Sequence, residues 1–450
     1  MMIIKILIGL MGLGIVVFVH ELGHFLAARF AGIRVEAFSI GWGKPILKKK
    51  IGSVEYRLGA FPIGGYCKMS DENEFEKAWE NHKNHLPADK GSFWAASPYR
   101  RILTAAAGPF FNIIFAIIVF AVIWKIGFEY ESMDNRIVLA SDITQEKSLP
   151  ADMAGLQTGD RILSINNKPV QNFHDIQRMV SVNAERNMAF EIERGDKKFN
   201  VMIKPELRKD SGAGMIGIYY YAEPVIEDII PDSSAANAGL QSGDRILKLN
   251  GKDILYSAAL IPLLNNLPEN STVEYQRAGS VFETKLSPQK DTPERPGIIW
   301  QSIQYHSPHY SLFGAVKKGI EETLWTLETT IRGFRLLFRG VDLTKSLSGP
   351  ARITWMAGEI ATEGFGQSIG EGLRITGNFL ALISIALGVT NLLPLPILDG
   401  GLIIIFIVEI IKRGPLNPKI FSVIQTAGVI IIAGLMIFAI TGDVMFFVRK

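Results

Sequence analysis

Two histidines and a glutamate stand close together in an otherwise apolar N-terminal stretch, FVHELGHFLAARFAG, residues 18–32. His20 and His24 are four residues apart, so on a helix both would lie on one face and could bind one metal ion. Glu21 is adjacent to them and is better placed to take a proton from water than to be a third ligand. An uncompensated charged group in a bilayer costs about 2.5–3.5 kcal/mol or more, and a shared metal would compensate all three. The alternative is that these are buried histidines hydrogen-bonded to neighbouring helices.

A catalytic zinc usually has three protein ligands and leaves one position for water. Asp399 is the best candidate for the third ligand, because it stands at the end of a long apolar run in NLLPLPILDGG, residues 391–401. Pro394 and Pro396 exclude a regular helix there, and irregular backbone at membrane depth must be covered by protein or line a cavity. The alternative is a proline kink followed by a capping aspartate. The other histidines lie in polar stretches and are expected at the surface: His82, His85, His174, His306 and His309.

Four segments are long and apolar enough to cross a bilayer, which requires about 20 residues. They are 6–28, 102–124, 375–398 and 420–442. A cleavable signal peptide is disfavoured for the first, because most of the flanking basic residues follow it. The connections 29–101 and 412–413 are basic, so the positive-inside rule places them in the cytoplasm and both termini on the outward side.

Composition excludes other classes of protein. The 450 residues are 48% hydrophobic and carry a net charge of only +3, which does not favour nucleic-acid binding. A single cysteine, Cys67, rules out an internal disulfide framework. The chain is therefore expected to be a membrane protein that also has a polar, globular part.

The polar part contains an internal repeat. The segment that begins at Ala154, AGLQTGDRILSINNKPV, is repeated with few changes from Ala238 as AGLQSGDRILKLNGKDI. Each copy predicts a short helix that stops at a glycine, a Gly-Asp turn and an apolar strand. A period of about 84 residues suits two copies of one small domain better than a solenoid.

Motifs at both ends of the chain resemble the site-2 protease family of intramembrane zinc proteases. The motifs are HELGH at 20–24, GPFFN at 108–112, NLLPLPILDGG at 391–401 and the hairpin-like stretch GAFPIGGYCKM at 59–69. The repeat resembles the PDZ domains of bacterial envelope proteases, in which a peptide adds as a strand to an exposed edge. The match covers nearly the whole chain in the right order. Within the family it is nearest to the bacterial members with tandem PDZ domains that act in the sigma-E stress response.

The resemblance implies a polytopic α-helical membrane protein with four transmembrane helices, a cytoplasmic re-entrant β-hairpin and two outward α+β PDZ-like domains. The expected parts are a first span (1–31), a cytoplasmic loop (32–99) with the hairpin at about 51–70, a second span (100–127), PDZ-like domains (128–220 and 221–308), an amphipathic connector (309–374), a third span (375–401), a cytoplasmic connection (402–419) and a fourth span (420–443). The implied location is the inner membrane, with the PDZ-like domains and both termini in the periplasm and the active site towards the cytoplasm.

The resemblance also implies an activity: a zinc endopeptidase with one Zn²⁺ held by His20, His24 and Asp399, and Glu21 as general base. Its substrate would be a single-span membrane protein, such as an anti-sigma factor, or a remnant signal peptide. Residues expected to bind substrate or an oxyanion are Asn391, Asn112, Gly64, Gly65, Pro394 and Pro396. Residues expected to form a PDZ peptide loop are Gly214, Met215, Ile216, Gly217 and Ile218; peptide binding, size gating and spacing are alternative roles for the PDZ pair.

Two other classes of protein remain open from the residues alone. A membrane-anchored PDZ scaffold that binds periplasmic protein termini accounts for the repeat but leaves His20, Glu21, His24 and Asp399 unexplained. A transporter is suggested by the broken helix before Asp399, because broken helices are common in transporters. The sequence lacks the paired membrane halves that many transporters have.

Overall fold

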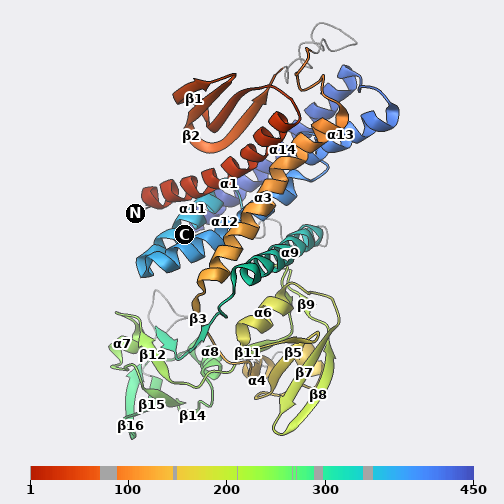
Figure 1. Ribbon diagram of the computed structural model, residues 1–450. Helices are drawn as coiled ribbons and strands as arrows, with labels where there is room; N and C mark the ends of the chain where they lie inside the picture. The colour runs from red at the N-terminus through yellow and green to blue at the C-terminus, as the bar shows by residue number, and fades with distance from the viewer. Residues whose placement is uncertain are drawn as a thin grey trace. The chain divides into compact units, whose positions relative to one another are not determined.

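The computed structural model describes residues 2–70, 89–144, 149–209, 211–265, 267–269, 271–287, 297–337 and 348–449. The chain divides into two compact units (Figure 1). A mainly helical unit comprises Met1–Phe128 and Pro308–Lys450, and a mainly β unit comprises Glu129–Ser307. His82 and His85 lie outside the described residues.

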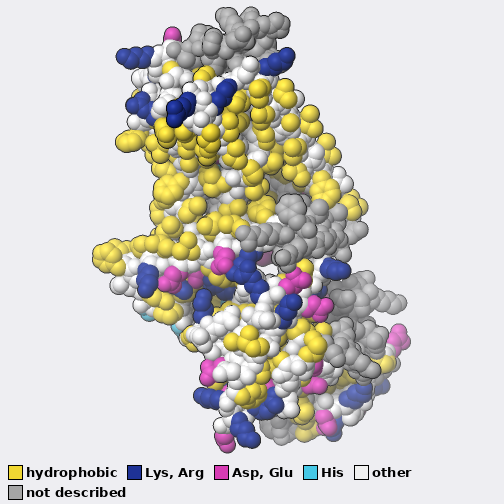
Figure 2. All heavy atoms as spheres, turned by 90° about the vertical axis from the view of Figure 1, so that its right-hand side faces the viewer, with side chains coloured by type: hydrophobic (Ala, Val, Ile, Leu, Met, Phe, Trp, Pro, Cys, Tyr) yellow, Lys and Arg dark blue, Asp and Glu magenta, His cyan; other side chains and the backbone are white. Residues whose placement is uncertain are grey.

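The helical unit is built from helices and two long strands. Its elements are α1 (Met2–Phe30), β1 (Val35–Ile51), β2 (Val54–Met69), α3 (Pro98–Ile126), α9 (Leu312–Leu337), α11 (Pro350–Gln367), α12 (Ile369–Asn391), α13 (Asp399–Lys412) and α14 (Pro418–Arg449). Among the described residues, α1, α3, α12 and α14 are long and apolar enough to cross a membrane. This agrees with the expectation of four membrane-length helices. Hydrophobic side chains cover the visible face of this unit as a broad band, with lysines and arginines gathered at one end (Figure 2).

Close helix contacts at glycines fix how α1, α3 and α12 cross. A Cβ on Gly23 of α1 would lie 2.4 Å from the carbonyl oxygen of Ala107 in α3. A Cβ on Gly388 of α12 would lie 3.2 Å from the carbonyl oxygen of Pro109, also in α3. Small residues allow helix backbones to approach closely in apolar surroundings, so α3 is held between the other two helices.

The expected third segment, 375–401, is not one continuous helix, as its two prolines predict. Helix α12 stops at Asn391, and a new helix, α13, begins at Asp399. The prolines at 394 and 396 explain the break, because neither supplies the amide that a continuing helix needs. The expected connection 402–419 is also helical as far as Lys412. Asp399 therefore stands in the first turn of a separate helix.

The hairpin begins earlier than the expected 51–70, since β1 starts at Val35. Its two long strands fold back, so that four segments pair. Residues 37–40 pair with 55–58 running in the same direction. They also pair with 65–68, which run in the opposite direction. Residues 45–51 pair with 54–59. The segment 65–69 therefore forms one edge of this small sheet, since no further described strand pairs with it.

Helix α9 begins the expected amphipathic connector. Phe313, Val316, Ile320 and Leu324 recur at helical spacing and are exposed. Leu327 instead packs against apolar side chains of α3 and α12. The helix therefore combines a packed side with an apolar face that the described part of the chain leaves exposed.

The β unit contains two similar domains, as the repeat predicts. The elements of the first are β3 (Glu129–Ser132), β4 (Ile137–Leu139), α4 (Ser141–Thr144), α5 (Pro150–Met153), β5 (Arg161–Ile165), β6 (Lys168–Pro169), α6 (Phe173–Ser181), β7 (Met188–Arg194), β8 (Lys197–Ile203), β9 (Glu206–Leu207), β10 (Gly214–Met215) and β11 (Ile218–Tyr220). Those of the second are β12 (Ile226–Ile229), α7 (Ser234–Asn237), β13 (Arg245–Leu249), β14 (Lys252–Asp253), the 3-10 helix η1 (Ser257–Leu260), α8 (Ile261–Asn265), β15 (Ser271–Arg277), β16 (Ser280–Leu286), β17 (Ile298–Trp300) and β18 (Ile303–His306). Equivalent four-stranded sheets, β6-β5-β7-β8 and β14-β13-β15-β16, form their centres.

The same ion pair between a buried aspartate and a partly exposed arginine occurs in both domains. Asp160 Oδ1 accepts a hydrogen bond from Arg194 Nε at 2.7 Å, and Asp244 Oδ1 accepts one from Arg277 Nε at 2.7 Å. These hydrogen bonds raise the pKa of both guanidinium groups. The Gly-Asp turn of each repeat is therefore tied to the end of a distant strand.

Candidate metal centre

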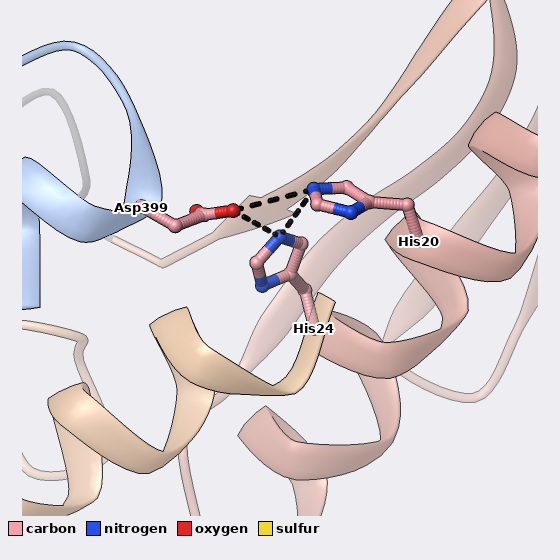
Figure 3. Close-up of side chains that lie close together, drawn as sticks. All are labelled: His20, His24 and Asp399. Atoms are coloured by element: carbon pink, nitrogen blue, oxygen red, sulfur yellow. Dashed lines mark hydrogen bonds and ion pairs between the residues drawn. The ribbon is translucent and has the colours of Figure 1, made fainter. Parts of the chain in front are cut away.

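Helix α1 places the two histidines of HELGH on one side, as the spacing predicts. The Nε2 atoms of His20 and His24 lie 3.1 Å apart, and both side chains are buried (Figure 3). Position i and position i+4 of a helix lie nearly above one another, which brings the two rings together. Both rings point away from α1 towards the start of α13.

Asp399 completes a three-residue cluster. Its Oδ2 lies 3.3 Å from His20 Nε2 and 3.5 Å from His24 Nε2. These three donor atoms could hold one metal ion, the single such group found among the described residues. With zinc–nitrogen and zinc–oxygen bonds of about 2.0–2.1 Å, tetrahedral geometry requires ligand atoms roughly 3.3–3.4 Å apart. The donor set and its spacing therefore fit zinc.

The position of the proton on the His24 ring leaves its Nε2 atom free to bind a metal ion. His24 Nδ1 lies 2.8 Å from the backbone oxygen of Thr104, which can only accept a hydrogen bond, so Nδ1 carries the proton. In the neutral ring, Nε2 then presents a lone pair towards His20 and the Asp399 carboxylate. Converging lone pairs and negative charge repel each other unless a proton or a metal ion lies between them, and a metal ion can bond all three donor atoms at once.

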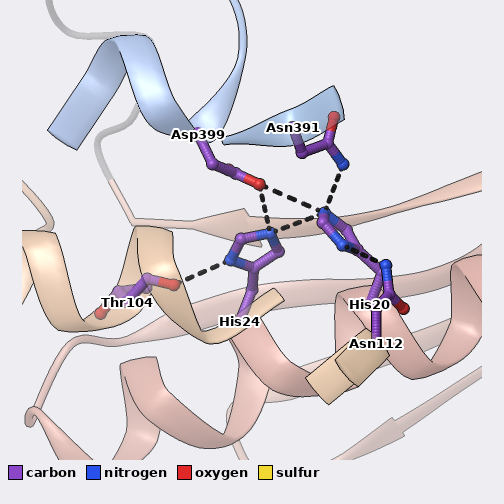
Figure 4. A network of polar contacts seen from close by, with 6 residues as sticks. All are labelled: His20, His24, Thr104, Asn112, Asn391 and Asp399. Atoms are coloured by element: carbon purple, nitrogen blue, oxygen red, sulfur yellow. Dashed lines mark hydrogen bonds and ion pairs between the residues drawn. The ribbon is translucent and has the colours of Figure 1, made fainter. Parts of the chain in front are cut away.

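Two asparagines reach His20 from different helices (Figure 4). The Asn112 amide nitrogen on α3 lies 3.1 Å from His20 Nδ1. The Asn391 amide nitrogen, at the end of α12, lies 3.2 Å from His20 Nε2. Asn391 therefore faces the space between the three donor atoms. Asn112 contacts the opposite side of the His20 ring, which faces away from that space.

Glu21 lies against the β-sheet edge. A Cβ added at Gly65 would lie 3.1 Å from Glu21 Cγ, and the backbone of Cys67 hydrogen-bonds the Glu21 carboxylate. Gly64 has a φ of +80°, and a Cβ there would lie 2.6 Å from Trp42 Nε1. The edge segment thus passes directly beside the expected general base.

The loop 392–398 is anchored on both sides, and its prolines shape the backbone. The carbonyl of Pro396 accepts a hydrogen bond from Gln425 Nε2 of α14 at 3.1 Å. A Cβ on Gly400 would lie 2.3 Å from the carbonyl oxygen of Leu392. Within the described residues, no hydrogen bond or ion pair joins Pro394 or Pro396 to the three-residue cluster.

Sequence reasoning missed two contributions from α3. The Thr104 carbonyl carries no sequence signal, because every residue has one. Gly108 is in the GPFFN motif, but its role follows only from the fold. A Cβ there would lie 2.3 Å from His24 Nε2 and 2.8 Å from His20 Cε1. Both imidazole rings therefore pack directly on the backbone of α3.

The five residues of the expected PDZ loop belong to the first β domain. Ile216 is buried in that domain's core, and its carbonyl accepts a hydrogen bond from the Ala151 N–H at 2.8 Å. Gly217 has a φ of +83° and accepts from the Ala140 N–H at 2.9 Å. Gly214 and Met215 form β10, which pairs with β9, and Ile218 begins β11. These contacts hold the stretch within one compact domain.

A helical unit with membrane-length helices and a buried His-His-Asp group beside a glutamate has the donor set of a zinc metalloprotease. A family model for peptidase family M50 matches residues 8–435. A putative zinc metalloprotease of Treponema pallidum is 36% identical over 446 residues, which cover 98% of this chain and 99% of that protein. The regulator of sigma-E protease RseP of Escherichia coli is 30% identical over 467 residues, covering 96% and 97%.

The class of protein is therefore a zinc-dependent metalloprotease. The chain belongs to peptidase family M50, whose model matches most of its length. Family membership accounts for the cofactor, Zn²⁺, and agrees with the cluster of His20, His24 and Asp399.

Proposed function

We propose that this protein cleaves a peptide bond of a single-span membrane protein, within or next to the bilayer. The position of the His20, His24 and Asp399 cluster carries the proposal. Two of the three residues lie on α1, a helix long and apolar enough to cross a membrane. All three are largely buried, and Glu21 is on the adjacent helix position. A protease acting on soluble chains has no need to place its centre in such a helix.

Each side chain has a distinct role in the proposed reaction. His20, His24 and Asp399 hold the zinc, which when bound lowers the pKa of water towards neutrality and polarises a carbonyl. Glu21 takes a proton from the attacking water and later delivers it to the leaving amine. Asn391, 3.2 Å from His20 Nε2, is placed to donate to the developing oxyanion or to hold the substrate backbone.

The sheet edge offers a way to present the substrate. A transmembrane helix satisfies its backbone hydrogen bonds internally and must unwind before it can be cut. An unwound segment can recover those bonds by adding as a strand to the edge at 65–69, which lies beside Glu21. Gly64 and Gly65 let this segment lie against Trp42 and Glu21, where a Cβ would not fit, and so keep the edge beside the general base.

The proposed physiological setting is supported by the name of one relative. The Escherichia coli protein is named a regulator of sigma-E protease. We infer that this chain lies in the inner membrane, with its centre towards the cytoplasm and the β unit and both termini in the periplasm. Its substrate is then an anti-sigma factor with one membrane span, or a remnant signal peptide. The PDZ-like pair would bind peptide termini through the 214–218 stretch or exclude bulky substrates.

Glu21→Gln separates catalysis from metal binding. We expect the purified variant to keep its zinc and to lose about 10²–10⁴-fold of its rate on a model single-span helix, the range typical of general acid–base groups. Zinc content is measured by elemental analysis and cleavage by mass spectrometry. The proposal fails if the wild type holds no zinc, or if the variant cleaves at the wild-type rate. A PDZ scaffold or a transporter would be indifferent to this change.

Cys67→Pro tests the sheet edge. Proline removes the Cys67 backbone N–H that bonds the Glu21 carboxylate, so we expect slower cleavage with unchanged zinc content. Lys49→Pro, in the segment at the opposite edge of the sheet, is the matched control and should cleave faster than Cys67→Pro. Loss of zinc from Cys67→Pro would mean that the edge supports the metal centre rather than the substrate.

A further inference from the structure

A buried ion pair joins the start of α3 to α13. Arg101 Nη2 lies 2.7 Å from Glu409 Oε2, and the two side chains are only 6% and 2% exposed. Arg101 Nε also donates to the Ala96 carbonyl at 3.1 Å, and Glu409 Oε1 accepts from the Leu416 N–H at 2.9 Å. Each charged group is thus held by more than one hydrogen bond.

Aromatic rings fix the guanidinium further. Its carbon lies 4.6 Å from the ring centre of Phe406 and 5.3 Å from that of Trp94. Phe406 is fully buried on α13, and Trp94 packs against Phe421 of α14. A planar guanidinium that stacks and forms a directed ion pair has little freedom to move, and lysine cannot reproduce this arrangement.

Both helices joined by this pair also build the metal centre. Three residues after Arg101, α3 carries Thr104, whose carbonyl orients His24. Asp399 begins the helix that carries Glu409, and the ten-residue separation corresponds to about 15 Å along α13. Gly400 packs on the Leu392 carbonyl at the near end of α13, so the ion pair holds the far end.

We propose that Arg101 and Glu409 are positioning residues for the metal centre: by clamping α13 to α3 they set the distance of Asp399 from His24. Buried ion pairs often add little net stability and can be replaced by apolar residues without loss. A role in geometry gives a reason to bury two charges here. The inference builds on the proposed assignment of His20, His24 and Asp399 as zinc ligands.

The double variant R101M/E409M tests the clamp, because it removes both charges and keeps apolar volume. We expect its zinc affinity, measured by chelator competition on the full chain in detergent, to fall at least tenfold, within the range typical of groups that orient metal ligands. The visible absorption of the cobalt-substituted protein should also change, because it reports the geometry around the metal. Unchanged affinity and an unchanged cobalt spectrum in a folded double variant would overturn the inference.

The ion pair between Lys5 and Glu359 provides the matched control. It joins α1 to α11 at 2.9 Å and is not attached to Thr104 or Asp399. K5M/E359M should keep wild-type zinc affinity and cobalt spectrum, and an equal loss in this control would overturn a specific role for Arg101 and Glu409.

If the double variant does not fold, two milder variants test whether Arg101 and Glu409 position the metal centre. E409Q keeps an acceptor for the Leu416 N–H but lacks the charge, and R101K keeps the charge but lacks the planar fork. Both should bind zinc at least threefold more weakly than wild type, and wild-type affinity in both would overturn the inference. If the wild type itself binds neither zinc nor cobalt, the proposed metal centre fails instead, which is a separate result.

Discussion

The side-chain amide of Asn112 lies 3.1 Å from Nδ1 of His20, and both side chains are buried. Since His20 Nε2 faces His24 and Asp399, Nδ1 must carry the proton when a metal is bound. As the amide is placed, Asn112 Oδ1 has no hydrogen-bond partner within the described residues. Turning the amide by half a turn gives Nδ1–H an acceptor. Helix α3 then orients both histidines, one through a side chain and one through the Thr104 carbonyl.

Asn112→Ala should therefore weaken zinc binding by about 10–100-fold, the usual cost of losing a group that orients a metal ligand. The affinity is measured by chelator competition. Ser384→Ala is the control, because the Ser384 hydroxyl donates to the Asn112 backbone oxygen and not to its side chain. An equal loss of zinc affinity in both variants would show that the effect comes from helix packing rather than from the orientation of the His20 ring.

Gly108→Ala should displace both imidazole rings. The added Cβ would lie within 3 Å of atoms of His24 and His20, so the rings or the helix must move. We expect most of the zinc to be lost on purification, as measured by elemental analysis. Gly434→Ala on α14 is the control, since a Cβ there meets no atom within 4 Å. A Gly108→Ala protein with a full complement of zinc would contradict this packing.

Removing the metal should lower the stability of the helical unit. A ligand at 100 times its Kd stabilises the state it binds by about 2.7 kcal/mol, so chelation should lower the melting temperature and zinc should restore it. Asp399→Asn should abolish most of this zinc-dependent shift. His174→Asn should retain it, because His174 is an exposed residue of the β unit. Thermal unfolding in detergent, with and without zinc, gives the comparison.

Asp160→Asn and Asp244→Asn should each loosen one β domain. Each aspartate is buried, pairs with an arginine and accepts a backbone N–H, from Gln157 or Gln241. The free energy of unfolding of the domain concerned should fall by about 1–3 kcal/mol, towards the lower end because solvent screens the partly exposed arginines. Hydrogen exchange of the full-length protein localises the effect. Asp253→Asn, at an exposed position, should leave exchange unchanged, and a uniform effect on both domains would contradict their separate cores.

Much of the fold follows directly from patterns along the chain. Long uncharged stretches predict α3 and α14 because only helices of about 20 residues satisfy their backbone in lipid. The repeat predicts two like domains, each with a short helix that ends just before a glycine, Gly155 or Gly239, both with positive φ. Pro394 and Pro396 predict the break after α12, but the start of the hairpin at Val35 was less predictable, because composition alone does not show where a strand begins or folds back.

The sequence by itself determined which residues could hold a metal. His20 and His24 are linked by helical spacing, and Asp399 stands out as an acid at the end of an apolar run. Only the tertiary structure decided that α13 brings Asp399 within 3.5 Å of both histidines. It also decided that Thr104, Gly108 and Asn112 surround them. A backbone carbonyl leaves no mark on residue type, and a glycine does not show what packs on it, because both contacts depend on how separate helices cross.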